Sequence, residues 1–189
     1  MITPRWQDII DKYYSDNAPL RAILIAHSGA VARLAKEINN IRGLNLDPEM
    51  IEYAAMLHDV GIVRTNAPAI ECRGSKPYIC HGAEGADMLR QAGAPEFVAR
   101  VAERHTGSGI SEEDIESQKL QLPRDRTYMP QDTLEKLICY ADKFFSKRPG
   151  CLTSVKSFEK VRGEMLKFGA DSLNRFDELD RQFHIAALV

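Results

Sequence analysis

Apolar residues recur every three to four positions along most of this chain, which is the spacing of one face of an α-helix, and strand-like alternation is hard to find. Helix starts are marked by a capping residue followed by proline, as at Asn17 and Asp47, and Gly43 ends the long helix between them. The pattern predicts a single all-α domain of about eight helices, spanning residues 1–189. The expected helices cover residues 3–14, 17–43, 47–58, 82–92, 95–105, 111–119, 132–146, 154–168 and 171–186.

Length, composition and charge agree with one folded, soluble domain. The 189 residues can bury roughly 70% of their unfolded surface, and the hydrophobic fraction of 44% excludes collagen-like and disordered classes. A net charge of −2 gives no general attraction to a polyanion, so bulk nucleic-acid binding is not expected. No apolar run approaches the ~20 residues of a membrane span and no signal pattern opens the chain, so we expect a cytoplasmic protein without a membrane partner.

Several histidines and aspartates fall where surface residues are not expected. On a helical wheel, His27 lies inside the apolar stripe of the helix over residues 17–43, and Asp142 lies at the edge of the apolar face over residues 132–146. His105 is in register with the apolar side at the end of its own helix. A carboxylate in such a position needs a partner, because an unpaired buried charge is heavily penalised.

Taken singly, each histidine is more often a hydrogen-bonded core or capping residue than a ligand. The joint pattern favours a metal site, because four of the five histidines and two aspartates stand inside or at the ends of helices that can converge in one bundle. Imidazole and carboxylate donors together suit Fe, Mn, Co or Zn better than Ca. The six side chains are His27, His58, Asp59, His81, His105 and Asp142.

The remaining metal-type side chains carry less weight. His184 lies in the last helix, outside the series, and is interpreted as structural. The four cysteines have no Cys-x-x-Cys spacing, which argues against a zinc knuckle or a redox dithiol. Cys80 directly precedes His81, so an accessory metal role is conceivable, but a small buried filler is the commoner role of a free cysteine.

Five segments of the chain together resemble HD-domain proteins of the metal-dependent phosphohydrolase superfamily, and small prokaryotic HDIG-type members in particular. In order, they are IAHSGAVARLA, AAMLHDVGI, CHGAEGADML, VAERHTGSGI and LICYADKF. The resemblance implies an HD-type helical bundle with its core over about residues 18–147 and the helices of 154–186 packed on it. The chain departs from the commoner His-Asp-Ile-Gly-Lys form, because Val60 replaces isoleucine and Ile62 stands where lysine is often found.

The resemblance also implies how the six side chains are used. A first divalent transition metal would be held by His27, His58, Asp59 and Asp142. A second would be held by Asp59, His81 and His105, so that Asp59 bridges two ions and these three residues form the catalytic side of the site. Two such ions attract phosphate and acidify a bound water.

The expected activity is therefore hydrolysis of a phosphomonoester or phosphodiester of a nucleotide-like small molecule by metal-activated hydroxide. Phosphate charge would be neutralised by four basic residues, Arg64, Lys143, Arg124 and Arg126. For each of them the alternative is a solvated surface charge. The loops over residues 64–80 and 120–131 adjoin ligand helices, so we expect their basic and tyrosine side chains to line the mouth of the site. The run over residues 105–109, HTGSG, is interpreted as a helix end rather than a phosphate loop.

Two other functions fit the same residues. A mixed-valent di-iron oxygenase, resembling the inositol-oxygenase branch of the superfamily, would use identical ligands. A non-catalytic nucleotide-binding module would use the metals structurally, although such a module does not need open coordination positions. Hydrolysis is favoured because most of the superfamily is hydrolytic. Substrate identity, metal identity, the number of ions and the oligomeric state stay open.

Overall fold

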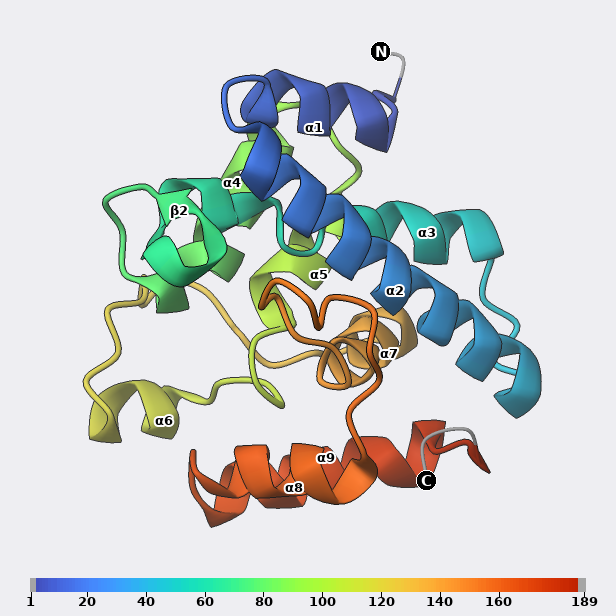
Figure 1. Ribbon diagram of the computed structural model, residues 1–189. Helices are drawn as coiled ribbons and strands as arrows, with labels where there is room; N and C mark the ends of the chain where they lie inside the picture. Colours follow the sequence, from blue (N-terminus) through green and yellow to red (C-terminus); the bar gives the residue numbers. More distant parts are fainter. Residues whose placement is uncertain (1–2, 187–189) are drawn as a thin grey trace.

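Helices form nearly all of the regular structure in this computed structural model, which describes residues 3–186. The all-α class expected from the sequence is confirmed. In Figure 1, α2 runs diagonally across the molecule, with α1 and α3 near it and with α8 and α9 side by side at the opposite edge. No helix among the described residues combines the length and the apolar character that crossing a bilayer requires. The α-helices are α1 (Trp6–Tyr14), α2 (Ala18–Arg42), α3 (Pro48–Leu57), α4 (His81–Gln91), α5 (Glu96–Arg104), α6 (Glu112–Ser117), α7 (Thr133–Asp142), α8 (Phe158–Leu166) and α9 (Ala170–Phe183).

Helix starts and stops follow the local sequence. The Asn17 side chain accepts a hydrogen bond from the Leu20 N–H at 3.1 Å, which satisfies a free donor at the start of α2. Gly43 ends α2 with φ of 61°, a left-handed conformation that glycine adopts without steric cost. Asp47 caps α3 by accepting from the Glu49 N–H at 2.8 Å. These local signals fix the extent of α2, which carries His27, and of α3, which ends directly before His58.

The segment over residues 64–80, expected to be a loop, contains short regular elements, and a 3-10 helix precedes it. Two-residue strands carry no readable alternation, so the sequence pattern could not indicate them. Gly74 allows the segment to fold back on itself, because a Cβ at this position would lie 2.1 Å from the Arg64 carbonyl oxygen. The elements are the 3-10 helices η1 (Val60–Arg64), η2 (Pro68–Ile70) and η3 (Tyr78–Cys80) and the antiparallel pair β1 (Asn66–Ala67) and β2 (Cys72–Arg73).

Helix α7 ends at Asp142, four residues before the end expected from the sequence. Beyond it, the N–H groups of Phe144 and Phe145 donate to the carbonyl groups of Ala141 and Asp142, three residues earlier, at 3.3 and 3.1 Å. This tighter winding is the usual way in which a helix terminates. Asp142 therefore stands at a helix end, and the chain turns immediately after it.

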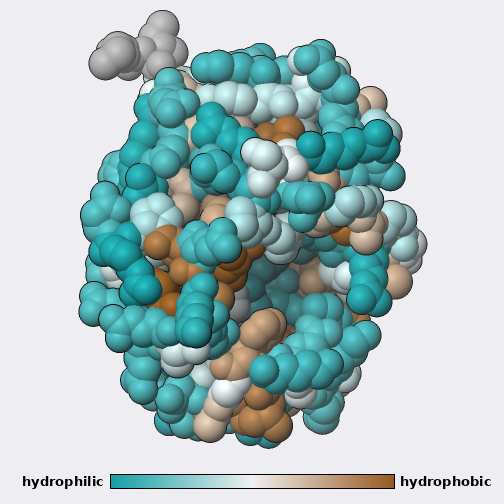
Figure 2. All heavy atoms as spheres, turned by 90° about the vertical axis from the view of Figure 1, so that its left-hand side faces the viewer, coloured by the Kyte–Doolittle hydropathy of each residue, from teal (hydrophilic) through white to brown (hydrophobic). Residues whose placement is uncertain are grey.

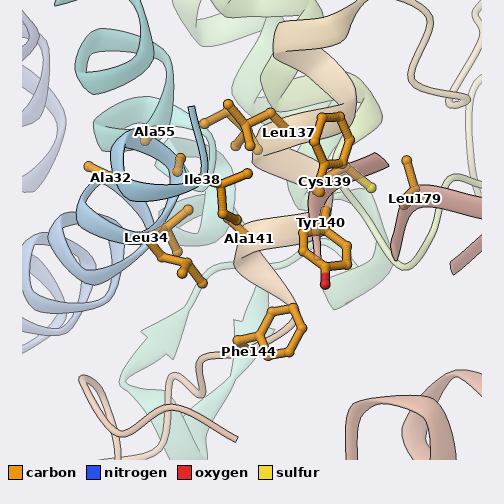
Figure 3. Packing of buried hydrophobic residues seen from close by; sticks show 14 of the residues in the cluster. Ala32, Leu34, Ile38, Ala55, Leu137, Cys139, Tyr140, Ala141, Phe144 and Leu179 are labelled. Carbon is orange, nitrogen blue, oxygen red and sulfur yellow. The ribbon is translucent and has the colours of Figure 1, made fainter. Parts of the chain in front are cut away.

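The main hydrophobic core lies between α2, α3, α7 and α9. Ile38 of α2 and Leu137 of α7 are fully buried there, and Tyr140 and Phe144 extend the core toward Leu179 of α9 (Figure 3). Each fully buried side chain of this size contributes about 1.5–3 kcal/mol to folding. Helix α9 thus packs against α7, the helix that ends at Asp142.

Candidate metal centre

Six polar side chains from separate helices and helix ends meet inside the bundle. His27 projects from the apolar face of α2, and the other five stand at the end or the beginning of an element, where the chain changes direction. None of the six is more than 7% exposed. The structure therefore brings together the complete series that the sequence singled out: His27, His58, Asp59, His81, His105 and Asp142.

The donor atoms form two groups that share Asp59, and within each group they lie within 4.8 Å of one another. The Asp59 Oδ2 atom lies 3.2 Å from His27 Nε2 and 3.1 Å from His58 Nε2. The Asp59 Oδ1 atom lies 3.5 Å from His81 Nε2 and 3.3 Å from His105 Nε2. Each carboxylate oxygen thus faces one group. Asp142 belongs to the first group, with its Oδ1 atom 2.9 Å from His27 Nε2.

Three of the histidine rings are oriented by the main chain. The Nδ1 atoms of His58, His81 and His105 lie 2.6, 2.7 and 2.8 Å from the carbonyl oxygen of the residue three positions earlier. A carbonyl oxygen only accepts, so Nδ1 carries the proton and donates in each case. When its Nε2 atom carries no proton, each ring presents a lone pair to the centre of the cluster, as a metal-binding histidine does.

The contact between His81 and His105 shows that these lone pairs lack a natural protein partner. Their Nε2 atoms lie 3.0 Å apart, and because both rings donate through Nδ1, neither Nε2 has a proton to offer the other. The Thr106 hydroxyl is 3.4 Å from His81 Nε2, too long for a strong hydrogen bond. About 3 Å is also the separation of two nitrogens bound to one ion at about 2.0–2.1 Å. A cation between them would remove the repulsion.

Orphaned atoms elsewhere in the cluster support the same conclusion. Both oxygens of Asp59 and the Nε2 atom of His58 are buried, and no hydrogen bond of suitable geometry satisfies them among the described residues. Nitrogen and carboxylate oxygen donors without sulfur suit a divalent transition metal in a site with open positions. The residues present therefore fit the metal that they were expected to bind.

The charges of the cluster are strongly coupled. Burial alone would raise the pKa of Asp59, but the Lys147 ammonium and His58 hold it well below the usual range of a carboxyl. Burial alone would lower the pKa of His58, but Asp59 and Asp142 raise it to about 9. Burial and the neighbouring His105 lower the pKa of His81 to about 3, which keeps that ring neutral. Protons and lysines thus balance the two carboxylates, and bound cations would do so in their place.

Lys147 is a residue of the cluster's surroundings that sequence reasoning missed. Its Nζ atom lies 2.6 Å from Asp59 Oδ2 and 3.8 Å from Asp142 Oδ1. Lys143, which was expected near the site, lies with its Nζ atom 2.7 Å from Asp142 Oδ2 and donates to the His105 carbonyl oxygen at 3.0 Å. Two ammonium groups therefore lie against the two carboxylates of the cluster.

A cavity of about 500 Å³ opens beside the cluster. His81, His105 and Asp142 contribute to its wall, together with Lys143 and Lys147. The rest of the wall includes residues of η3, the segment of residues 106–110, α6, α8 and α9, together with residues between these elements such as Phe145 and Lys156. Figure 2 shows the face of the molecule that includes α6, where the surface is hollowed and apolar side chains lie beside the hollow.

The arginines expected to bind phosphate are already paired with carboxylates. Arg64 lies 3.1 Å from Glu84, and Arg126 lies 2.8 Å from Asp87. Arg124 is exposed and lies 3.8 Å from Glu116. In the part of the chain that the structure describes, these three arginines are absent from the wall of the cavity, which Lys143 does line. Their phosphate-binding role stays a prediction.

The two loops expected at the mouth of the site contribute unequally. The segment over residues 64–80 lines the cavity through Tyr78 and Ile79, and the segment over 120–131 does so through Leu120. Tyr78 stacks on the His81 ring with centroids 4.8 Å apart. Cys80 donates to the Gln121 carbonyl oxygen at 3.0 Å and is in neither donor group. The segment over residues 105–109 follows the end of α5 at Arg104, as the helix-end interpretation required.

The arrangement of helices and the central cluster agree with a comparison against known families. The family model of the HD domain matches residues 24–146. The chain belongs to the HD-domain family. The matched segment contains all six cluster residues, and HD domains bind divalent metal ions, so the buried His/Asp cluster of this HD domain is a metal-type site.

Relatives of this HD domain include proteins of different length. The chain is 35% identical over 147 residues to the uncharacterized protein MJ0778 of Methanocaldococcus jannaschii. The aligned region covers 75% of this chain and 78% of that protein. It is 34% and 32% identical to the tRNA (cytidine(56)-2'-O)-methyltransferases of Thermoplasma volcanium and Picrophilus torridus, over 77% and 66% of this chain. The matches cover 38% and 32% of those two enzymes. No solved structure matches the chain.

Glycine at position 61 permits a close approach between two backbone segments of this HD domain. A Cβ atom there would lie 2.1 Å from the His81 carbonyl oxygen and 2.4 Å from the Gly85 nitrogen. Only a residue without a side chain lets η1 lie directly against α4 at this distance. The approach holds Asp59, just before η1, next to His81, at the start of α4.

Proposed function

We propose that this HD domain is a metal-dependent phosphohydrolase that cleaves a phosphomonoester or phosphodiester of a nucleotide-like small molecule. The observation that carries the proposal is the position of Asp59. Each of its carboxylate oxygens faces one of the two donor groups, and Lys143 and Lys147 line the cavity beside them. A divalent transition metal, Fe, Mn, Co or Zn, would be held in each group. When bound, the ions would polarise phosphoryl oxygens and lower the pKa of a water from 15.7 to about 7.

The chain's own residues would orient and neutralise the substrate. Main-chain carbonyl groups fix the rings of His58, His81 and His105, so ligand orientation requires little reorganisation on binding. Lys143 and Lys147 lie in the wall of the same cavity as the cluster, where their ammonium groups would offset the negative charge of a phosphate. The enclosed position strengthens these interactions because water is partly excluded.

The named relatives support the nucleotide part of the proposal but not methyl transfer. Two of them are named as enzymes that act on tRNA, which supports a nucleotide as the organic part of the substrate. The matches leave about two thirds of each methyltransferase without a counterpart in this chain. The six cluster residues of this chain suit hydrolysis with a bound metal.

The test is reconstitution of metal-free protein with Mn, Co, Zn or Fe, each alone, followed by a screen for phosphate or nitrophenol release. The substrates are nucleoside monophosphates, cyclic nucleotides and bis(p-nitrophenyl) phosphate. We expect metal-dependent turnover that falls at least ~100-fold in His105→Gln, because one ligand is lost. His184→Gln is the matched control, since His184 pairs with Asp180 outside the cluster and its loss should leave turnover unchanged.

Other outcomes would contradict the proposal. Iron-loaded protein that consumes oxygen, gives a mixed-valence EPR signal and releases no phosphate would identify an oxygenase. Protein that binds nucleotides but turns over no substrate with any metal would identify a binding module. Equal turnover in His105→Gln and His184→Gln would separate the activity from this cluster.

A further inference from the structure

The cavity beside the cluster has an apolar part that the proposed chemistry does not use. Its wall there includes the side chains of Ile110 after α5, Phe145 after α7 and Met165 in α8. A volume of about 500 Å³ falls within the usual range of small-molecule sites, which combine apolar walls with a few placed polar groups. A phosphate would contact the cluster and the two lysines, so the apolar part is available to the organic portion of the same ligand.

Phe168, just after α8, is a large apolar residue of this wall that the fold leaves exposed. Its exposed fraction is 56%, against 6% for Phe145 and 5% for Met165. Phe168 also lines a second hollow of about 430 Å³, together with residues of α6 and the start of α9. Its side chain therefore lies at the boundary of two hollows. A ligand in the cavity that covers this apolar surface gains free energy, because the surface is removed from water.

The main chain fixes the position of Phe168. Its N–H donates to the Met165 carbonyl oxygen at 3.0 Å, and the Gly169 N–H donates to the Leu166 carbonyl oxygen at 3.0 Å. These bonds close the end of α8 as a tight turn, in the way in which helices commonly terminate. Binding a ligand against Phe168 thus requires little ordering of the backbone, which is one of the main costs of association.

Polar contacts connect this end of α8 to the cluster. Lys143, whose Nζ atom contacts Asp142, accepts through its carbonyl oxygen from Lys156 Nζ at 3.1 Å. Lys156 also pairs with Glu164 of α8 at 2.8 Å. Glu164 stands four residues before Phe168, and each of these side chains lines the cavity. A ligand with its phosphate at the lysines therefore spans two regions of wall that the protein holds at a set distance.

The charged side chains that α6, α8 and α9 contribute to the wall are paired within the protein. Asp114 Oδ2 accepts from the Arg175 guanidinium at 2.6 Å, and Glu164 pairs with Lys156. This part of the wall therefore offers a ligand apolar and aromatic surface more than free charged groups. Every nucleobase has a π face that stacks on an aromatic ring, so such a wall can hold a base without selecting one base over another.

We propose that Phe168 stacks on the base of a bound nucleotide whose phosphate lies against the cluster. The inference rests on the proposed function and adds a residue that recognises the organic part of its substrate. A second copy of the chain is the other occupant to consider for an exposed phenylalanine. Leu166 is 55% exposed but is absent from the described residues that line the cavity. Phe168 belongs to the same cavity as the lysines, which favours a nucleotide over a protein surface.

The experiment measures equilibrium binding of two ligands to the full, Mn-loaded chain by calorimetry. They are the methylenephosphonate analogues of AMP and of ribose 5-phosphate, in which a carbon replaces the ester oxygen, so that hydrolysis does not remove them. The two ligands share the sugar and the phosphonate, and only the first has a base. We expect the AMP analogue to bind at least ~10-fold more tightly, because its base stacks on Phe168.

Variants at two positions assign this preference to one side chain. Phe168→Ala should reduce it to about twofold or less, and Phe168→Trp should keep it, because tryptophan retains a π face. Leu166→Ala is the matched control, since it removes an equally exposed apolar side chain two residues away and should leave the preference unchanged. All three positions of change lie on the surface, so we expect thermal midpoints near that of the wild type.

Equal affinities for the two analogues, or a preference that Phe168→Ala leaves unchanged, would overturn the inference. A wild-type dimer that dissociates in Phe168→Ala, without preference for the AMP analogue, would overturn it in favour of contact between two copies. A preference that depends on Phe168 in a protein that releases no phosphate with any metal would instead refute the hydrolase and leave the stacking residue standing. Phosphate release without the preference would do the reverse.

Discussion

Replacing Gly61 by alanine tests whether the packing of η1 on α4 builds the cluster. The added methyl carbon would lie 2.1 Å from the His81 carbonyl oxygen and 2.4 Å from the Gly85 nitrogen. Both distances are more than 1 Å below the ~3.5 Å at which non-bonded heavy atoms come into contact. Neither neighbour is the flexible end of a side chain, so the two backbone segments must move apart.

The displacement has a cost in stability and a cost in metal binding. Overpacking of a tight interior costs about 1–3 kcal/mol, and backbone overlap falls at the upper end, so we expect a loss of about 3 kcal/mol. For a chain of this length that corresponds to a fall of about 6–12 °C in the thermal midpoint. A shift of about 1 Å between Asp59 and His81 also exceeds the ~0.2 Å tolerance of metal–ligand distances. The variant should lose the ion of the second donor group and keep the first.

Calorimetric melting and elemental analysis of the same purified sample measure both effects. Gly163→Ala is the matched control, because a Cβ at this exposed position in α8 meets nothing within 4 Å. Alanine is the better helix former by about 1 kcal/mol, so the control should be as stable as the wild type or slightly more stable. A Gly61→Ala protein with an unchanged midpoint and full metal content would refute the reasoning.

Two further predictions concern charges around the cluster. Burial raises the pKa of Glu135, but hydrogen bonds from the Gln131 N–H, Arg104 and Arg100 lower it overall. The ionised Glu135 side chain therefore contributes fully to stability above about pH 4.5, and this contribution is lost as the pH falls below that value. Glu135→Gln should therefore lower the free energy of unfolding by about 3 kcal/mol at pH 7, measured by urea denaturation, and by less at pH 3. An equal difference from the wild type at both pH values would contradict this. Lys147→Met should tighten divalent metal binding roughly tenfold or more in a chelator competition, because a competing cation next to Asp59 is removed, and unchanged affinity would show that Lys147 does not compete with the metal.

The sequence was sufficient to predict most of the fold and the members of the cluster. Capping residues such as Asn17 and Asp47 act through the backbone within three residues, so they are readable without tertiary information. The cluster was readable because polar residues on apolar helix faces are rare. His27 on the buried stripe of α2 is the clearest case.

Features that depend on tertiary packing were not readable. Lys147 lies beyond the end of α7, and only the turn at Phe144 and Phe145 directs it toward Asp59. The pairing of Arg126 with Asp87, 39 residues away, is equally invisible in the local sequence. The role of a basic residue therefore depends on which carboxylates fold next to it, and neither charge nor position in a loop determines that.

The rings of His58, His81 and His105 are anchored to main-chain carbonyl groups, and this affects which positions of the protein can change in sequence. A main-chain carbonyl is present whatever amino acid occupies the position, so exchanging Ala55, Tyr78 or Ala102 leaves the anchoring acceptor in place. The walls contributed by α6, α8 and α9 include side chains such as Asp114, Met165 and Arg175, which change with every substitution. Evolution, or a protein engineer, could therefore change the cavity wall on those helices while keeping the histidine rings of the cluster in place.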